Sequence, residues 1–258
     1  MRFFTLFILF CLLSANVFAQ APKDVEADLL RSFRKISYWS DKKSDAAINP
    51  TDSLYKANGR FGKLLKDYTE RYPATIREPF DSLKKERLDI VTAADSLFRI
   101  YSWDTWTGGT MRFFNNVLQY KAGQKLHSIL DTSKTGHRYI YFYTNLYTFK
   151  ANSKTYYLGV YKGIFSSKDV GEGIQVFSID NGRLNTDVKL IKTTSGLHSK
   201  LYYSYDFFSV IHRKERPTIT FNAATQTINL PLVDAKGNVT HKFITYKFTG
   251  EYFEKVKS

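Results

Sequence analysis

Cysteine is nearly absent from this chain. Its 258 residues include a single cysteine, Cys11, which lies in an apolar run at the N-terminus. If that run is removed during export, the mature protein has no thiol and forms no disulfide. Thiolate catalysis and cysteine-ligated metal sites are then excluded. A domain of this size can still be stable, because a large core offsets the missing cross-links.

Long hydrophobic runs are also absent, apart from this first one. Arg2 precedes the nearly continuous apolar stretch Phe3–Leu13, and Val17-Phe18-Ala19 matches the small-x-small pattern at which signal peptidase cuts. We therefore predict a signal peptide over residues 1–19, cleavage after Ala19, and a periplasmic or extracellular protein that begins at Gln20.

Two other interpretations of the N-terminal segment are weaker. A membrane anchor needs about 20 apolar residues, and Asn16 interrupts this run before that length is reached. A lipid anchor on Cys11 needs a small residue before the cysteine, whereas Phe10 occupies that position. We expect no transmembrane segment after signal cleavage.

Acidic residues are in deficit. The chain has 38 Lys and Arg against 24 Asp and Glu, a formal charge of +14. The basic residues are spread along the sequence, which favours solvated faces over one binding patch. An exported chain without a nucleic-acid recognition motif is a poor candidate for binding nucleic acid. The charge instead suits acidic polymers of a cell envelope, such as anionic lipid headgroups, lipopolysaccharide or acidic glycans.

Familiar catalytic motifs are missing. There is no G-x-S-x-G, P-loop or dinucleotide fingerprint, and the five histidines form no H-x-H or H-x-x-x-H pair. We therefore predict no metal and no cofactor. S-x-x-K occurs at Ser32, Ser53 and Ser82, but it is a common helical pair. Carboxylate pairs for glycoside hydrolysis depend on their separation in space; the candidates near predicted loops are Asp104, Asp169, Glu172 and Glu251.

Helical periodicity dominates the mature chain up to about Asp95. Apolar residues recur every three or four positions over Asp52–Tyr72, after Asn49-Pro50-Thr51 and before Pro73. A third helix is predicted from Pro79, because proline is common in a first helical turn. We expect a helical N-terminal part over residues 20–95.

The segments that follow alternate polar and apolar residues and are rich in aromatic and β-branched side chains. Turn signals such as Asn181-Gly182 separate them. Strands without intervening helices indicate an antiparallel sheet. The sequence therefore predicts an α+β fold, with N-terminal helices followed by an antiparallel β domain over residues 96–258, sandwich or barrel-like. The predicted strands are Leu97–Trp103, Thr110–Tyr120, Tyr139–Phe149, Thr155–Tyr161, Ile174–Ile179, Val188–Thr193, Leu201–Phe207, Thr218–Phe221, Thr227–Pro231 and Lys242–Phe248.

The most distinctive segment contains two tryptophans beside a glycine turn. Indole rings stack on the apolar faces of sugars, and neighbouring hydroxyls and carboxylates bind sugar hydroxyls. The alternative is that Trp103 ends a buried strand and Gly108-Gly109 simply forms a hairpin. The predicted ligand contacts are Trp103, Asp104, Trp106, Thr107 and Thr110.

The run Ser96–Asp104, the following Gly108-Gly109-Thr110, the ending Ile244–Phe253 and a mature start at Gln20 resemble uncharacterised exported proteins of Bacteroidetes-type bacteria. That resemblance implies origin and compartment and no chemistry. The triplet Asp-Ser-Leu, which occurs three times, is similar to the acceptor of the general O-glycosylation system of such bacteria; the candidate serines are Ser53, Ser82 and Ser96. The alternative is that Asp and Ser serve as helix caps.

These observations favour an exported, non-enzymatic envelope protein with a binding or structural role, for which glycans or envelope proteins are the expected partners. The alternative is a hydrolase that acts on envelope polysaccharide or peptidoglycan, with its site near Trp103–Thr110. A binding face should be shallow and expose an indole. An enzyme should have a cleft with at least two titratable groups in perturbed environments.

Intact-mass measurement of the protein from its native host tests both the cleavage and the glycans. We expect a chain that begins at Gln20, with added glycan mass if Ser53, Ser82 or Ser96 is modified. An unprocessed N-terminus contradicts the predicted signal peptide, and an unmodified mature mass contradicts the glycosylation.

Overall fold

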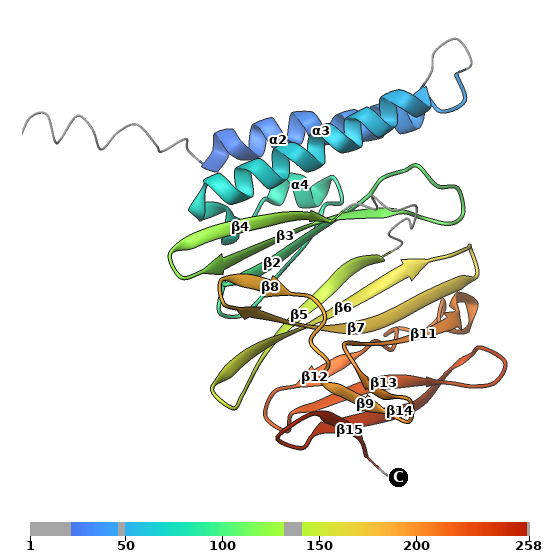
Figure 1. Cartoon of the computed structure of the whole chain (residues 1–258). Coiled ribbons are helices and arrows are strands. Elements are labelled where there is room, and N and C mark those ends of the chain that lie inside the picture. The colour runs from blue at the N-terminus through green and yellow to red at the C-terminus, as the bar shows by residue number, and fades with distance from the viewer. Residues whose placement is uncertain (1–21, 46–49, 132–140, 257–258) are drawn as a thin grey trace, which may run out of the picture.

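The computed structural model describes residues 22–45, 50–131 and 141–256. Within them the chain forms four layers, a helical layer followed by three stacked β-sheets (Figure 1). This confirms the predicted α+β class, with N-terminal helices and mainly antiparallel sheets. The predicted signal peptide, Met1–Ala19, lies outside the described residues.

The helical layer consists of α2 (Pro22–Asp41) and α3 (Pro50–Arg71), which pack side by side (Figure 1). Each buries the apolar stripe that its sequence predicts, with Leu29 and Phe33 on α2 and Phe61 and Leu65 on α3 among the residues removed from solvent. No helix in the described ranges combines the length and apolar character that crossing a membrane requires.

The predicted third helix is much shorter than expected. Pro73 ends α3 and begins the 3₁₀ turn η2 (Pro73–Ile76). Helix α4 covers only Asp81–Lys85, after Phe80 in the left-handed region. The chain then extends into a strand, so sheet structure begins inside the segment predicted to be helical.

The strands form three sheets. Sheet A, next to the helices, contains β1 (Asp89–Thr92), β2 (Phe98–Asp104), β3 (Phe114–Ala122) and β4 (Lys125–Asp131). Sheet B contains β5 (Tyr141–Ala151), β6 (Lys154–Ile164), β7 (Asp169–Asp180), β8 (Arg183–Asn185) and β11 (Lys200–Asp206). Sheet C contains β9 (Ile191–Thr193), β10 (Gly196–His198), β12 (Thr220–Asn222), β13 (Thr227–Val233), β14 (Val239–Phe248) and β15 (Phe253–Lys255), and the 3₁₀ turn η3 (Phe207–Ser209) follows β11. All pairs are antiparallel except β15 with β9.

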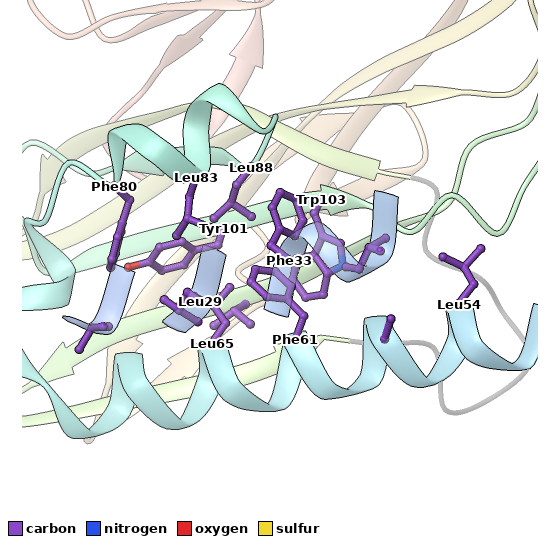
Figure 2. Close-up of a cluster of buried hydrophobic side chains, with 14 residues drawn as sticks. Leu29, Phe33, Leu54, Phe61, Leu65, Phe80, Leu83, Leu88, Tyr101 and Trp103 are labelled. Atoms are coloured by element: carbon purple, nitrogen blue, oxygen red, sulfur yellow. The ribbon is translucent and has the colours of Figure 1, made fainter. Parts of the chain in front are cut away.

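Sheet A is buried on both faces, as β2 shows. Phe98 and Ile100 pack against sheet B, whereas Tyr101 and Trp103 pack against the helices. Side chains alternate between faces along a strand, so a strand between two layers must be apolar at nearly every position. Figure 2 shows the helix-facing side, where Phe61 of α3 meets Trp103 edge-on at a ring distance of 5.1 Å.

Polar side chains also tie the helical layer to sheet A. Gln119 donates to the Thr69 carbonyl at 2.7 Å and to the Thr75 hydroxyl at 2.8 Å. Arg99, buried between the rings of Phe80 and Tyr101, donates to the backbone carbonyl of Thr75 at 2.8 Å. Burial lowers the pKa of the Arg99 guanidinium. These bonds fix the η2–α4 segment, which forms one wall of the cleft described below.

Candidate functional site

Trp103, predicted to contact a ligand, instead belongs to the core. Its side chain is fully buried, and its indole Nε1 donates to Oδ1 of Asn58 on α3 at 3.0 Å. The prediction for this residue is corrected: its position on the helix-facing side of β2 places it beneath α3, out of reach of a sugar.

Asn58 also fixes the chain that follows Trp103. Its side-chain nitrogen donates to the carbonyl of Thr105 at 2.9 Å and to the carbonyl of Leu54 at the same distance. Both ends of this buried amide are therefore satisfied by specific partners. The bonds hold the end of β2 against α3 and determine where Asp104 and Trp106 emerge from the core.

Asp104, Trp106 and Arg112 form a compact unit at this point. Asp104 Oδ1 accepts from the Trp106 backbone N–H at 2.7 Å, and its Oδ2 lies 3.3 Å from Arg112 Nη1. The Arg112 guanidinium carbon lies 4.7 Å from the centroid of the Trp106 ring. One face of this indole is therefore covered by a cation, and the half-buried side chain lines the cleft with what remains accessible.

The two predicted threonines lie farther along the same loop. The Thr107 hydroxyl contacts that of Thr105 at 2.8 Å, and Thr110 is exposed to solvent. Gly108 is required between them, because a Cβ there would lie 2.0 Å from the Met111 carbonyl oxygen. Neither threonine lines the cleft beside Trp106.

This cleft has a volume of about 720 Å³ and lies at the β1 edge of sheet A, where three layers meet. Helices α2 and α4 form one side, the Asp104–Trp106 unit with Arg112 a second, and Phe142 and Ile164 of sheet B a third. It is large enough for a small molecule or a short polymer segment.

Two carboxyl groups in the cleft have raised pKa values. Partial burial raises the pKa of Asp104 despite its bonds to Trp106 and Arg112. Asp89 remains accessible to solvent, yet the surrounding walls raise its pKa to about 6. Asp89 pairs with Ser102, two residues before Asp104, so both carboxyls project from the same face with Cα atoms about 7–8 Å apart.

Basic side chains line the opposite side. Lys84, Lys85 and Arg87 lie on α4 and the turn after it, and none of them has an ion-pair partner among the described residues. Glu86, between them, is already bound to Arg34 of α2 at 2.8 Å. The cleft thus combines aromatic surface, cations without an ion-pair partner among the described residues, and four carboxyl groups, those of Asp41, Glu86, Asp89 and Asp104.

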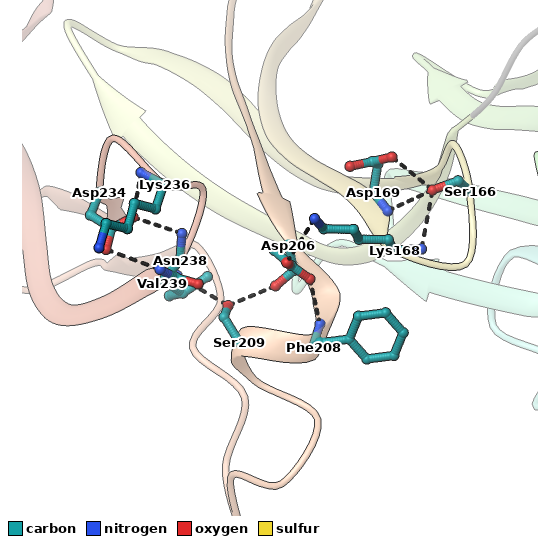
Figure 3. Close-up of polar contacts among 10 residues, drawn as sticks. All are labelled: Ser166, Lys168, Asp169, Asp206, Phe208, Ser209, Asp234, Lys236, Asn238 and Val239. Carbon is teal, nitrogen blue, oxygen red and sulfur yellow. Dashed lines mark hydrogen bonds and ion pairs between the residues drawn. The ribbon is translucent and has the colours of Figure 1, made fainter.

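Of the other carboxylates singled out from the sequence, Asp169 and Glu172 form structural hydrogen bonds, whereas the Glu251 side chain forms none among the described residues. Figure 3 shows the end of sheets B and C where Asp169 accepts a hydrogen bond of 2.8 Å from the Ser166 hydroxyl. In the same view Asp206 accepts from the Phe208 N–H at 2.9 Å. Glu172 is fully buried between sheets B and C, where it accepts from Tyr203 and Thr218, and Glu251 is exposed in a turn.

The predicted glycosylation sites lie outside the cleft. Ser53 and Ser82 stand in the first turns of α3 and α4, and Ser96 occupies the β1–β2 turn. All three are half-buried. Asp95, before Ser96, accepts from the Leu97 N–H at 2.9 Å, as expected of a turn residue. Modification of these serines remains a prediction.

The search for known relatives adds no assignment: neither a protein-family model nor a curated protein matches this chain. The site is therefore interpreted from its geometry alone.

The raised pKa of Asp89 gives a testable pH dependence. The pKa of Asp89 rises from 3.8 to about 6 on folding, so the folded protein binds the proton of this carboxyl more tightly than the unfolded chain does. The stability that this group contributes is present below pH 3.8 and lost as the pH rises through 6. We expect an NMR titration midpoint near 6 for Asp89, and an Asp89→Asn variant that gains stability relative to the parent above pH 6. A midpoint near 4 contradicts the enclosed site.

Proposed function

We propose that this protein is an exported binding protein of the cell envelope and that its cleft holds a segment of an acidic glycan. The observation that carries the proposal is the combination of three groups in one cleft: the Asp104–Trp106–Arg112 unit, the carboxyl of Asp89, and the cations of α4. Sugars present apolar C–H faces and many hydroxyls, so they need aromatic surface together with charged donors and acceptors.

The cations of α4 and the turn after it favour an acidic sugar, although the cleft as a whole carries as many carboxyl groups as basic groups: Asp41, Glu86, Asp89 and Asp104 against Lys84, Lys85, Arg87 and Arg112. Glu86 is bound to Arg34 and Asp104 to Arg112, whereas Lys84, Lys85 and Arg87 have no ion-pair partner among the described residues. A ligand carboxylate or sulfate would bring these cations an opposite charge. The formal charge of +14 for the whole chain favours the same ligands at long range.

A hydrolase is the second candidate, and the carboxyl pair favours it. In inverting glycosidases one carboxylic acid protonates the leaving group and the other activates water, and the two carboxyl groups lie about 6.5–9.5 Å apart. The β1–β2 register places Asp89 and Asp104 on the same face of sheet A, which is compatible with such a pair. Asp89, with a pKa of about 6, suits the acid, and Asp104 would be the base. Against this role, both Asp104 oxygens already accept hydrogen bonds from Trp106 and Arg112.

Binding to soluble polymers tests the proposal. We expect the mature chain to bind polygalacturonate more tightly than neutral dextran, with affinity that falls as salt rises. The double variant Lys84→Gln/Arg87→Gln should weaken binding about tenfold, equivalent to about 1.4 kcal/mol. The matched control, Lys214→Gln/Lys236→Gln, removes two exposed lysines that do not line the cleft and should bind as the parent does.

An assay for reducing ends in the same binding mixtures distinguishes a binding protein from a hydrolase. Binding without release of new reducing ends favours a binding protein, whereas release that an Asp89→Asn variant abolishes favours the hydrolase. Failure of the parent to bind either polymer contradicts the proposed glycan function.

A further inference from the structure

A second cavity lies between sheets A and B and shares no lining residue with the cleft. Its volume is about 340 Å³, within the range of small-molecule sites. Four aromatic rings line it, those of Tyr141, Tyr143, Tyr161 and Phe177. The polar lining residues are Asn116, Asp131, Gln175, Thr186 and Lys200.

Glycines on sheet B create this space. A Cβ at Gly173 would lie 2.3 Å from Cζ of Tyr161, and one at Gly159 would lie 3.0 Å from both Tyr143 and Phe177. Any larger residue would force these rings away from sheet B and toward sheet A. The glycines therefore let the rings lie close to sheet B and keep the cavity open.

The amides in the wall are already engaged. Gln175 accepts from the Tyr143 hydroxyl at 2.9 Å and donates to the Thr186 carbonyl at 2.7 Å. Tyr161 differs, because it is only 4% exposed and its hydroxyl has no hydrogen-bond partner among the described residues. The Tyr161 hydroxyl is not among the fully buried, unpartnered side-chain atoms; it borders the cavity, where a ligand atom can pair with it.

Lys200 supplies the charge at the β11 side of the cavity. It pairs with Gln175 across β11 and β7, so both side chains project from the same face of sheet B. Partial burial lowers the pKa of Lys200, although Asp131 and Asp187 oppose that shift. The exposed ammonium of Lys200 can bind an anion that enters the cavity, in competition with Asp131 of the same wall.

We propose that this cavity binds a small aromatic carboxylate, with its ring among the tyrosines, its carboxylate at Lys200 and a ring hydroxyl at Tyr161. Ring distances of 4.7 Å between Tyr141 and Tyr161 and 6.0 Å between Tyr143 and Tyr161 are typical of favourable aromatic pairs. A further ring can join this cluster with the same geometry. The lysine favours an acid over a neutral compound, and Asp131 in the same wall opposes that preference.

Calorimetric titration of the mature chain tests this site with three probes: 4-hydroxybenzoate, its neutral analogue 4-hydroxybenzamide, and acetate. We expect 4-hydroxybenzoate to bind at least tenfold more tightly than either of the others, since only it offers both the ring and the charge. Equal binding of the acid and the amide overturns the proposal, as does the absence of 4-hydroxybenzoate binding at millimolar concentration.

Three variants locate the binding. Lys200→Met should remove the preference for the acid, and Tyr161→Phe should weaken 4-hydroxybenzoate binding without affecting benzoate. Gly173→Ala should abolish binding by displacing the Tyr161 ring, but it can also destabilise the fold, so circular dichroism accompanies it. Lys192→Met, on sheet C, is the matched control and should bind as the parent does. An unchanged preference in Lys200→Met overturns the assignment to this cavity.

Discussion

The hydrogen bonds of one buried amide, Asn58, hold the candidate site in place. This side chain joins α3 to both Trp103 and Thr105, at the end of the strand from which Asp104 and Trp106 emerge. A strand between two layers has no solvent to satisfy its polar groups, so each must find a partner inside the protein. Asn58 provides those partners and thereby positions one wall of the cleft.

The same requirement accounts for the polar residues elsewhere in the stack. Sheets A and B each have neighbours on both faces, and each side chain buried between layers has to be apolar or specifically bonded. Gln119 meets this need between the helices and sheet A, and Glu172 meets it between sheets B and C. Arg99 meets it only in part, because its Nε has no hydrogen-bond partner among the described residues. The cleft and the tyrosine-lined cavity occur where layers meet and side chains do not fill the space.

The sequence predicted the elements better than the site. The apolar stripe that includes Phe61 and Leu65 was enough to predict α3, because the period of a helix is a local property of the sequence. Strand β1 was missed because it has only four residues, and β8, β10 and β15 because they have three. Strand β4 (Lys125–Asp131) was also missed, although it has seven residues.

The candidate site depended on information that a linear pattern does not carry. Side chains along β2 point alternately to its two faces, and the sequence does not say whether the face that carries Trp103 is covered by a helix or open to solvent. The burial of Trp103 could therefore not be predicted from the sequence alone. Asp89 lies near Asp104 because of the register between β1 and β2, which the sequence does not specify. Arg112 contacts Trp106 because the loop between them folds back, which is equally hidden in the linear pattern. The sequence did single out Asp104 and Trp106, since an indole and a carboxylate beside a glycine turn are unusual.

Hydrogen–deuterium exchange on an Asn58→Leu variant tests the central claim most directly. Leucine has a similar size but leaves Trp103 Nε1 and the Thr105 carbonyl without partners, a cost of about 1–3 kcal/mol for a buried polar group. The account predicts faster exchange at the amides of Thr105 and Trp106, with sheet C unchanged and a Tyr55→Leu control, exposed on the same helix, like the parent. Unchanged exchange at those amides would contradict it.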